Sequence, residues 1–294
     1  MTRYDMLARI ASQRVLWASW SRVAAGSAIA GTDGITAAEF ARSLGPRLAK
    51  LSRLLTAGRY QPQPLRPMVA LRGTKARVRA VPTVCDRIVQ RAFLTVCAPA
   101  LSDRVEASYA YRPGRSWLDA VARAQQHRDA GLRWLLRTDI DDFFATIDHA
   151  ELARSIATRI ADPSVVDLVN GWVAAPLLTA GGLTARPRGL PEGAPVSPLL
   201  AELYLAEVDA KIHHRYGQLV RYADDIAVFC STMHDARCTR RWRRSAGWSP
   251  HWPNVGCGST PRKPTSPASP TDSTCSAGTS RTSGPGPSPL RPQH

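Results

Sequence analysis

The apolar residues in the first part of the chain recur at the helical period. Those of residues 1–30 and those between Thr36 and Gly58 lie three or four positions apart, which predicts amphipathic helices. Thr36 and Glu39 have the spacing of a capping box, so a helix is expected to begin there. Gly45-Pro46 interrupts the apolar face, which favours two shorter helices or a kinked one.

The next stretch has the composition of extended chain. Residues 60–82 contain two β-prone runs, Met68–Leu71 and Val78–Val81, separated by a glycine turn. A helical pattern then covers Asp86–Ala98. We therefore expect a hairpin that leads directly into a helix.

A third pattern is a largely apolar run, Leu132–Ile140, which predicts a buried strand with Asp139 close to its end. Three helix-start signals come after it, at Asp148, Asp162-Pro163 and Ser197-Pro198. The last of them precedes a predicted hairpin, formed by Leu219-Val220 and the run Ile226–Phe229. Strand, helices, long helix and hairpin predict an α+β fold.

The tip of this last hairpin carries two adjacent acids, Asp224 and Asp225. Adjacent carboxylates repel each other unless a cation lies between them, and a hard divalent ion such as Mg²⁺ prefers carboxylate oxygens. Taken alone, these residues also fit an ordinary surface turn. Asp139, on a separate predicted strand, would complete a set of three acids able to hold two Mg²⁺ ions, or Mn²⁺ in their place, about 4 Å apart.

The charge of the chain predicts a polyanionic partner. Its 294 residues include 39 Lys and Arg against 23 Asp and Glu, a formal net charge of +16. Residues 1–230 carry +9 of this charge, so the body is basic without its C-terminal region. Nucleic acid is the simplest partner, bound through phosphate neutralisation and counterion release.

The six cysteines show no CxxC spacing, which argues against a zinc site or a disulfide framework. The N-terminal residues lack the apolar core and cleavage site of a signal peptide. The chain contains no run of 18 apolar residues, so no membrane span is expected. These features together predict a cytoplasmic protein that does not contact a membrane.

Residues 231–294 have a different composition. They are rich in Pro and Ser and contain neither Phe nor Ile. Such a segment cannot bury enough apolar surface to offset its chain entropy, so we expect it to be disordered. The organisation predicted is a folded domain over residues 1–230 followed by this tail.

Five motifs, together with a short N-terminal extension, resemble those of the reverse transcriptases in order and spacing, most closely the bacterial group II intron type. The motifs are Ala30-Gly31-Thr32-Asp33-Gly34 in the extension, then Arg77-x-x-x-Val81-Pro82-Thr83-x-x-Asp86-Arg87-Ile88-Val89-Gln90 as the first block, Ser108-Tyr109-Ala110-Tyr111-Arg112-Pro113-Gly114-Arg115-Ser116 as the second, Asp139-Ile140-x-x-Phe143-Phe144-x-x-Ile147-Asp148-His149 as the third, Gly189-Leu190-Pro191-Glu192-Gly193-x-Pro195-x-Ser197-Pro198-Leu199-Leu200-Ala201 as the fourth, and Arg221-Tyr222-Ala223-Asp224-Asp225 as the fifth. The resemblance covers roughly residues 30–230.

The resemblance implies a right-hand polymerase with fingers and palm, the palm being an antiparallel sheet with packed helices. Such an enzyme copies an RNA template into DNA from a DNA primer. Asp139, Asp224 and Asp225 match the family's metal-binding aspartates, and Ile140, next to the first of them, matches a further metal-binding position. A cognate structured RNA is a further partner that the resemblance suggests, whereas it leaves the oligomeric state open.

The resemblance also implies binding roles around the metal site. Phe144 matches the aromatic residue that blocks a ribose 2′-hydroxyl, although a core phenylalanine is the alternative. The other positions matched to the incoming dNTP are Ile140, Asp141 and Asp142 through backbone N–H groups, and Lys75 and Arg77 through their charges. Arg112 and Arg115 match template-binding positions, although exposed arginines are also common in glycine turns.

Glu192 departs from the family pattern, which has Gln at this position beside the incoming nucleotide. A carboxylate beside a triphosphate repels it unless the acid is protonated or paired with a neighbour such as Arg188 or Lys75. This substitution is expected to weaken dNTP binding or to mark a specialised branch of the family.

A second departure is expected after Cys230, where the family continues with further blocks and a thumb that residues 231–294 do not match. The Ser, Pro and Arg content of residues 231–294 is typical of GC-rich DNA read out of frame. We therefore expect a frameshift near residues 231–240 and a truncated enzyme with little or no activity. The coding DNA tests this, because another reading frame should then encode an apolar-periodic thumb.

Three functions remain open from the sequence. The first is an RNA-directed DNA polymerase that uses two-metal-ion phosphoryl transfer. The second is a non-catalytic nucleic-acid-binding remnant of such an enzyme. The third, an RNA-dependent RNA polymerase, is disfavoured by Phe144 and by the order of the motifs.

Overall fold

The structure is a computed structural model that describes residues 6–26, 29–72, 75–101, 106–138, 140, 142–215, 218–236 and 258–259. The chain divides into two units, residues 1–260 and residues 261–294. Every described residue belongs to the first unit. The expectation of a disordered tail therefore falls almost entirely on residues outside those described.

The N-terminal part is a group of short helices, as the apolar spacing predicts: α1 (Met6–Ala11), α2 (Gln13–Ala24), α3 (Ala37–Ala41) and α4 (Leu44–Thr56). The predicted capping box is present, since the Thr36 side chain accepts from the Glu39 N–H and Glu39 accepts from the Thr36 N–H. Gly45-Pro46 lies in the first turn of α4, so the region forms two helices.

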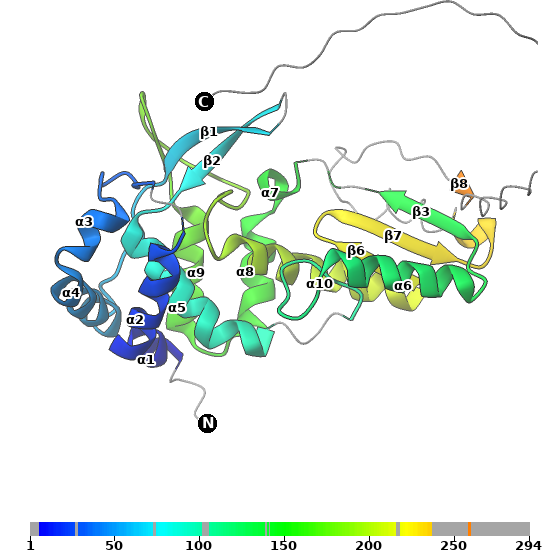
Figure 1. Cartoon of the computed structure of the whole chain (residues 1–294), viewed down its shortest axis with the longest axis horizontal. Coiled ribbons are helices and arrows are strands. Elements are labelled where there is room, and N and C mark those ends of the chain that lie inside the picture. Colours follow the sequence, from blue (N-terminus) through cyan, green and yellow to red (C-terminus); the bar gives the residue numbers. More distant parts are fainter. Residues whose placement is uncertain are drawn as a thin grey trace, which may run out of the picture. The chain divides into compact units, whose positions relative to one another are not determined.

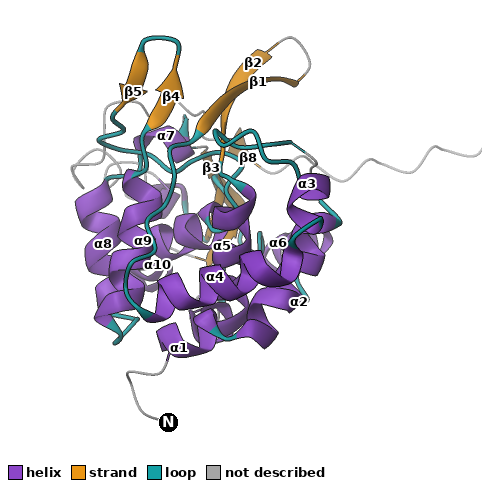
Figure 2. Cartoon of the chain, turned by 90° about the vertical axis from the view of Figure 1, so that its left-hand side faces the viewer, coloured by secondary structure: helices purple, strands orange, loops and turns teal. Residues whose placement is uncertain are grey.

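Two antiparallel hairpins lie side by side beyond these helices (Figure 2). The first pairs β1 (Arg66–Arg72) with β2 (Lys75–Val81), where two β-prone runs were expected. The second pairs β4 (Leu177–Thr179) with β5 (Gly182–Thr184). Leu65 joins the two, because its N–H donates to Pro176 O at 2.7 Å and its carbonyl accepts from Leu178 N at 2.9 Å.

A second group of helices packs against the N-terminal group. Its members are α5 (Val84–Leu101), α7 (Phe143–Thr146), α8 (His149–Ala157) and α9 (Pro163–Ala174). Asp162 caps α9 through the Ser164 N–H, with Pro163 at the first helical position. Phe93 of α5 meets Trp172 of α9 edge to face, with ring centroids 5.7 Å apart. One apolar core joins both groups of helices.

The main sheet is antiparallel, with strand order β6-β7-β3-β8. Its strands are β3 (Trp134–Thr138), β6 (Gln218–Tyr222), β7 (Asp225–Cys230) and β8 (Gly258–Ser259). Successive side chains of a strand point to opposite faces. Accordingly, Leu219 joins the large helical core, whereas Val220 packs with Ala120 in a smaller cluster.

Helices cover this sheet (Figure 1). Helix α6 (Trp117–Asp129) contributes Ala120 to the smaller cluster, and α10 (Ser197–Arg215) contributes Leu200 and Leu203 to the large core. An antiparallel sheet with packed helices, beside a hairpin-bearing helical region, matches the α+β fingers and palm expected from the sequence. Among the described residues, none of the helices is long and apolar enough to cross a membrane.

Candidate active site

The acidic turn lies at the end of the β6–β7 hairpin. Tyr222 pairs with Asp225 across the strands, so Ala223 and Asp224 form a two-residue loop. Ala223 has φ +57°, a left-handed conformation that costs a non-glycine residue about 1–2 kcal/mol. Asp224 is half-buried and Asp225 is exposed. Surrounding contacts must therefore hold this turn in place.

Strand β3 ends at the level of the turn. Thr138, the residue before Asp139 in the sequence, pairs with Ile226, the residue after Asp225. Arg137 Nη2 contacts Asp225 Oδ1 at 3.2 Å, and both side chains are more than half exposed. Such a surface pair contributes about 0–1 kcal/mol, so a stronger ligand can displace it. Asp139 and Asp141 themselves lie outside the described residues.

The described part of the chain holds no cluster of three or more His, Cys, Asp or Glu side chains able to bind a metal. Of the expected metal set, the structure describes Ile140, which is buried, and the two acids of the turn. Their carboxylate oxygens are the donors that Mg²⁺ prefers, which fits the expected ion.

The third and fourth sequence blocks pack directly against each other through their backbones. Gly189 N–H donates to Ile147 O at 2.7 Å, and Leu190 N–H donates to Phe144 O at 2.6 Å. Gly189 has φ +84°, and an added Cβ would lie 2.8 Å from Ala145 O and 2.9 Å from Phe144 O. Only glycine fits this close crossing, because a side chain would meet backbone on that side.

Phe144 is only partly buried. Its ring meets Phe143 at a centroid distance of 5.7 Å, and it packs at the edge of the main core. Phe143, in contrast, is buried. Ile140 is also buried, whereas Asp142 is exposed and precedes α7 with φ +45°. Phe144 thus keeps an open surface, as a contact with a bound nucleotide requires.

Glu192 links the fourth block to the fingers hairpin. Its carbonyl accepts from the Ala80 N–H of β2 at 2.8 Å, and its side chain is partly exposed. Among the described residues Glu192 forms no ion pair with Arg188, one of the two partners expected for it. The side chains of Lys75, the other partner, and of Arg77 lie outside the described ones.

The second block contributes a residue to which the sequence assigns no role. Tyr111 has φ +57° and is 52% exposed. Burial raises the pKa of its hydroxyl, and the charges of Asp224, Glu202 and Glu192 raise it further. Tyr111 therefore lies within electrostatic reach of the acidic turn and of the fourth block. Its position inside the second motif is the only sequence signal for this placement.

Arg112 and Arg115 contact their own loop. Both donate to the carbonyl of Ser108, at 3.2 and 2.9 Å, and Arg115 also donates to Glu106 O at 2.5 Å. The Arg115 guanidinium lies 5.0 Å from the centroid of the Tyr109 ring. These contacts stabilise the conformation of the second block. The contact of Arg112 and Arg115 with a template stays a prediction.

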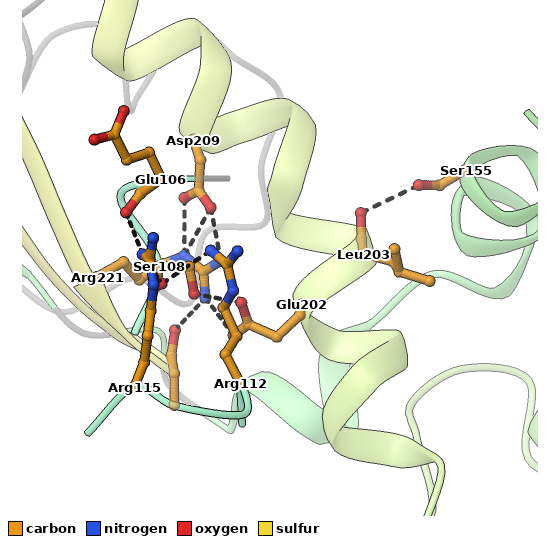
Figure 3. A network of polar contacts seen from close by, with 10 residues as sticks. Glu106, Ser108, Arg112, Arg115, Ser155, Glu202, Leu203, Asp209 and Arg221 are labelled. Atoms are coloured by element: carbon orange, nitrogen blue, oxygen red, sulfur yellow. Dashed lines mark hydrogen bonds and ion pairs between the residues drawn. The ribbon is translucent and has the colours of Figure 1, made fainter. Parts of the chain in front are cut away.

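A buried ion network surrounds Arg221, three residues before Asp224 in the chain (Figure 3). Arg221, with 0% exposure, donates through Nε and Nη2 to Asp209 at 2.6–3.0 Å and through Nη1 and Nη2 to Glu202 at 2.8 and 3.0 Å. The Ser108 hydroxyl donates to Glu202 as well. Burial alone would lower the pKa of Arg221, but the two carboxylates outweigh it and raise that pKa above its ordinary value.

The sequence carries a faint signal for this network. Glu202 and Asp209 lie seven residues apart and therefore on one face of α10, among apolar residues such as Leu205 and Val208. Acids at such positions are rarely buried unless they are paired. The basic partner follows in the fifth block, but the sequence alone does not connect the two.

The comparisons with known proteins agree with this geometry. Residues 71–244 match the family model described as "Reverse transcriptase (RNA-dependent DNA polymerase)". This match spans more than half of the chain and includes all five blocks completely. The chain belongs to the reverse transcriptase family.

Relatives of known sequence include Protein YkfC of Escherichia coli, 32% identical over 223 residues, which are 73% of this chain and 58% of that protein. The group II intron-encoded protein LtrA of Lactococcus lactis is 31% identical over 169 residues, which are 55% of this chain and 28% of LtrA. The chain thus spans little more than half the length of the first relative and less than a third of the second.

Solved structures show the same fold. A partial Cas6-RT-Cas1–Cas2 complex matches with a TM-score of 0.50 and 24% identity, covering 81% of this chain and 40% of that one. Apo telomerase from Candida tropicalis matches with a TM-score of 0.51 and 12% identity, covering 64% and 42%. At these identities the likeness concerns the fold, which is the fingers and palm of a polymerase.

Proposed function

We propose that the chain is an RNA-directed DNA polymerase that adds dNTPs to a primer 3′-hydroxyl on an RNA template. The observation that carries the proposal is the acidic turn, Asp224-Asp225, placed beside the end of β3 in a palm sheet of this family. This position leaves the two carboxylates accessible for a metal ion and a phosphate chain.

Asp139 is proposed as the third ligand. Consecutive Cα atoms lie about 3.8 Å apart, so the residue after Thr138 is within reach of the turn that Thr138 adjoins in register. Mg²⁺ held by these acids would neutralise phosphate charge and lower the pKa of a primer hydroxyl. Arg137 would release Asp225, at little cost, when the ion binds.

The remaining predicted residues are proposed to position the nucleotide. The partly exposed ring of Phe144 would contact the sugar, next to backbone N–H groups of Ile140, Asp141 and Asp142. Lys75 and Arg77 would supply positive charge to the triphosphate. Glu192 adds a negative charge close to this region, which predicts weaker dNTP binding than a Gln would give.

An arginine-lined cavity supports a nucleic-acid partner. Its volume is about 190 Å³, and it is lined by Arg22, Arg79, Arg87 and Arg91 together with glycine and apolar residues. Burial lowers the pKa of Arg91, and the positive charge of Arg22 lowers it further. No Asp or Glu is among the described residues of its wall. Phosphates of a bound strand would relieve this repulsion between like charges.

A non-catalytic nucleic-acid binder is the second candidate, favoured by the carboxylate of Glu192 in the nucleotide-binding region. Primer extension separates the two functions. The purified chain receives a labelled DNA primer on an RNA template, Mg²⁺, and either dNTPs or rNTPs. Extension of the primer with dNTPs but not with rNTPs supports the polymerase. If the primer is not extended, and fluorescence anisotropy shows salt-sensitive binding of the nucleic acid, the result supports the binder.

A further inference from the structure

We propose that Arg221 is a positioning residue that holds the Asp224-Asp225 turn in its metal-binding shape. The proposal rests on the function proposed above. The turn contains the left-handed Ala223, which a free hairpin would tend to abandon. Arg221 Nη1 donates to the carbonyl of Ala223 at 2.9 Å, two residues ahead in the chain. This bond fixes the peptide that leads into Asp224.

The guanidinium is itself held from α10. Asp209 accepts from two of its nitrogens, and Glu202 accepts from two, with Nη2 shared between them. The fork geometry of arginine permits several such bonds at once, which the single ammonium of lysine cannot reproduce. Asp209 is 1% exposed, so water does not compete for these bonds. The turn is therefore anchored to a helix of the core.

The backbone of Arg221 adds a second anchor. Its N–H donates to Ala107 O at 2.8 Å, and its carbonyl accepts from the Tyr109 N–H at 3.0 Å, a parallel bridge beside Ser108. Ser108 also donates its hydroxyl to Glu202. Figure 3 shows Arg112 and Arg115 of the second block donating to the Ser108 carbonyl. Arg221 thus joins α10, the second block and the acidic turn.

Removing the arginine alone would leave two acids unpaired in the core, so loss of function could reflect unfolding. A triple variant avoids this problem: Arg221→Met, Asp209→Leu and Glu202→Gln. It replaces the buried charges with apolar or neutral groups of similar size, which often preserves stability. It still lacks the donor to Ala223. Arg221→Lys is the second variant, because it keeps the charge and loses the fork.

Two measurements read out positioning. Binding of Mn²⁺, the probe, is followed by electron paramagnetic resonance of the free ion, and amide hydrogen exchange is followed for the peptide that contains residues 219–229. Both variants are expected to bind Mn²⁺ about 10- to 100-fold more weakly than the wild type, with faster exchange in the hairpin. Ser155→Ala is the control, since it removes a 3.1 Å bond to Leu203 of α10 away from the turn.

A folded triple variant with wild-type Mn²⁺ affinity and a protected hairpin would overturn the proposal. If that variant does not fold, a folded Arg221→Lys protein with unchanged affinity and exchange overturns it equally. Absence of Mn²⁺ binding by the wild type would instead refute the proposed metal site. Hydrogen exchange in the hairpin would then decide the positioning role by itself.

Discussion

At the scale of single residues, Gly189 is a position that admits only glycine, where the third and fourth blocks cross. The sequence motif identifies this glycine. It does not explain why no other residue fits, because the atoms that a side chain would meet belong to residues 144–145. The same holds for Arg221, whose partners lie on α10. A sequence records which residues are present, whereas these constraints arise from contacts between distant segments.

Gly189→Ala should destabilise the fold more than Gly114→Ala. Both glycines have positive φ, so each substitution costs about 1–2 kcal/mol for the left-handed backbone. Only at position 189 does the new methyl meet backbone atoms, adding about 1–3 kcal/mol, since nothing lies within 4 Å of a Cβ at Gly114. Urea unfolding of the two variants measures the difference, and equal losses would contradict the described crossing.

Cys85 should react slowly with iodoacetamide in the folded protein. Burial raises the pKa of its thiol to about 11, from an ordinary value of 9.0. The reactive thiolate at pH 8 is then about 100-fold scarcer than for a free thiol. The rate should rise as pH approaches that pKa, and it should rise at once in urea. Mass spectrometry of the modified peptide checks this, and rapid labelling of the native protein would refute it.

At the scale of elements, the apolar pattern predicts most helices and both strands of the two long hairpins. Helix α6 is an exception with a physical cause. Its large apolar residues Trp117, Leu118 and Val121 are exposed, while Ala120 and His127 face the sheet. The positions of the large apolar residues therefore predict burial of the face of α6 that is in fact exposed. The apolar pattern also gives no sign of the β4–β5 hairpin, since its three-residue strands are too short to show a period.

Ser116 should be the main local determinant of where α6 begins. Its side chain accepts from the Asp119 N–H, and Asp119 accepts from the Ser116 N–H at 2.7 Å. Ser116→Ala is expected to lower the free energy of unfolding by about 1 kcal/mol, and Ser116→Thr to restore most of it. Guanidinium unfolding followed by circular dichroism gives both values. Equal stability of the Ala variant and the wild type would contradict this cap.

At the scale of the whole molecule, the sequence motifs predict the family and the fold correctly. The structure describes only part of the predicted active site. Asp224 and Asp225 lie at the hairpin tip as expected, but Asp139, Asp141 and the side chains of Lys75 and Arg77 fall outside the described residues. Buried features such as the network of Arg221 could not be predicted, because residues 108, 202, 209 and 221 meet only after folding.

The arginine-lined cavity should contribute to binding of RNA. Arg91→Gln is expected to weaken binding of a labelled single-stranded RNA and to reduce the slope of log K against log salt by about 1. Arg128→Gln is the matched control, because Arg128 is already paired with Asp129 at 2.9 Å. Fluorescence anisotropy between low and moderate salt measures both slopes. An unchanged slope for Arg91→Gln would exclude a phosphate contact by Arg91.

The central claim is that the acidic turn holds the metal ions of a polymerase. Single-turnover incorporation of one dNTP onto a DNA primer paired with RNA tests it most directly, in Mg²⁺, for the wild type, Asp224→Asn and the exposed control Asp129→Asn. The incorporation rate of the wild type, even if it is low, should be kept by the control and should fall at least about 100-fold in Asp224→Asn. Equal incorporation by all three proteins would contradict it.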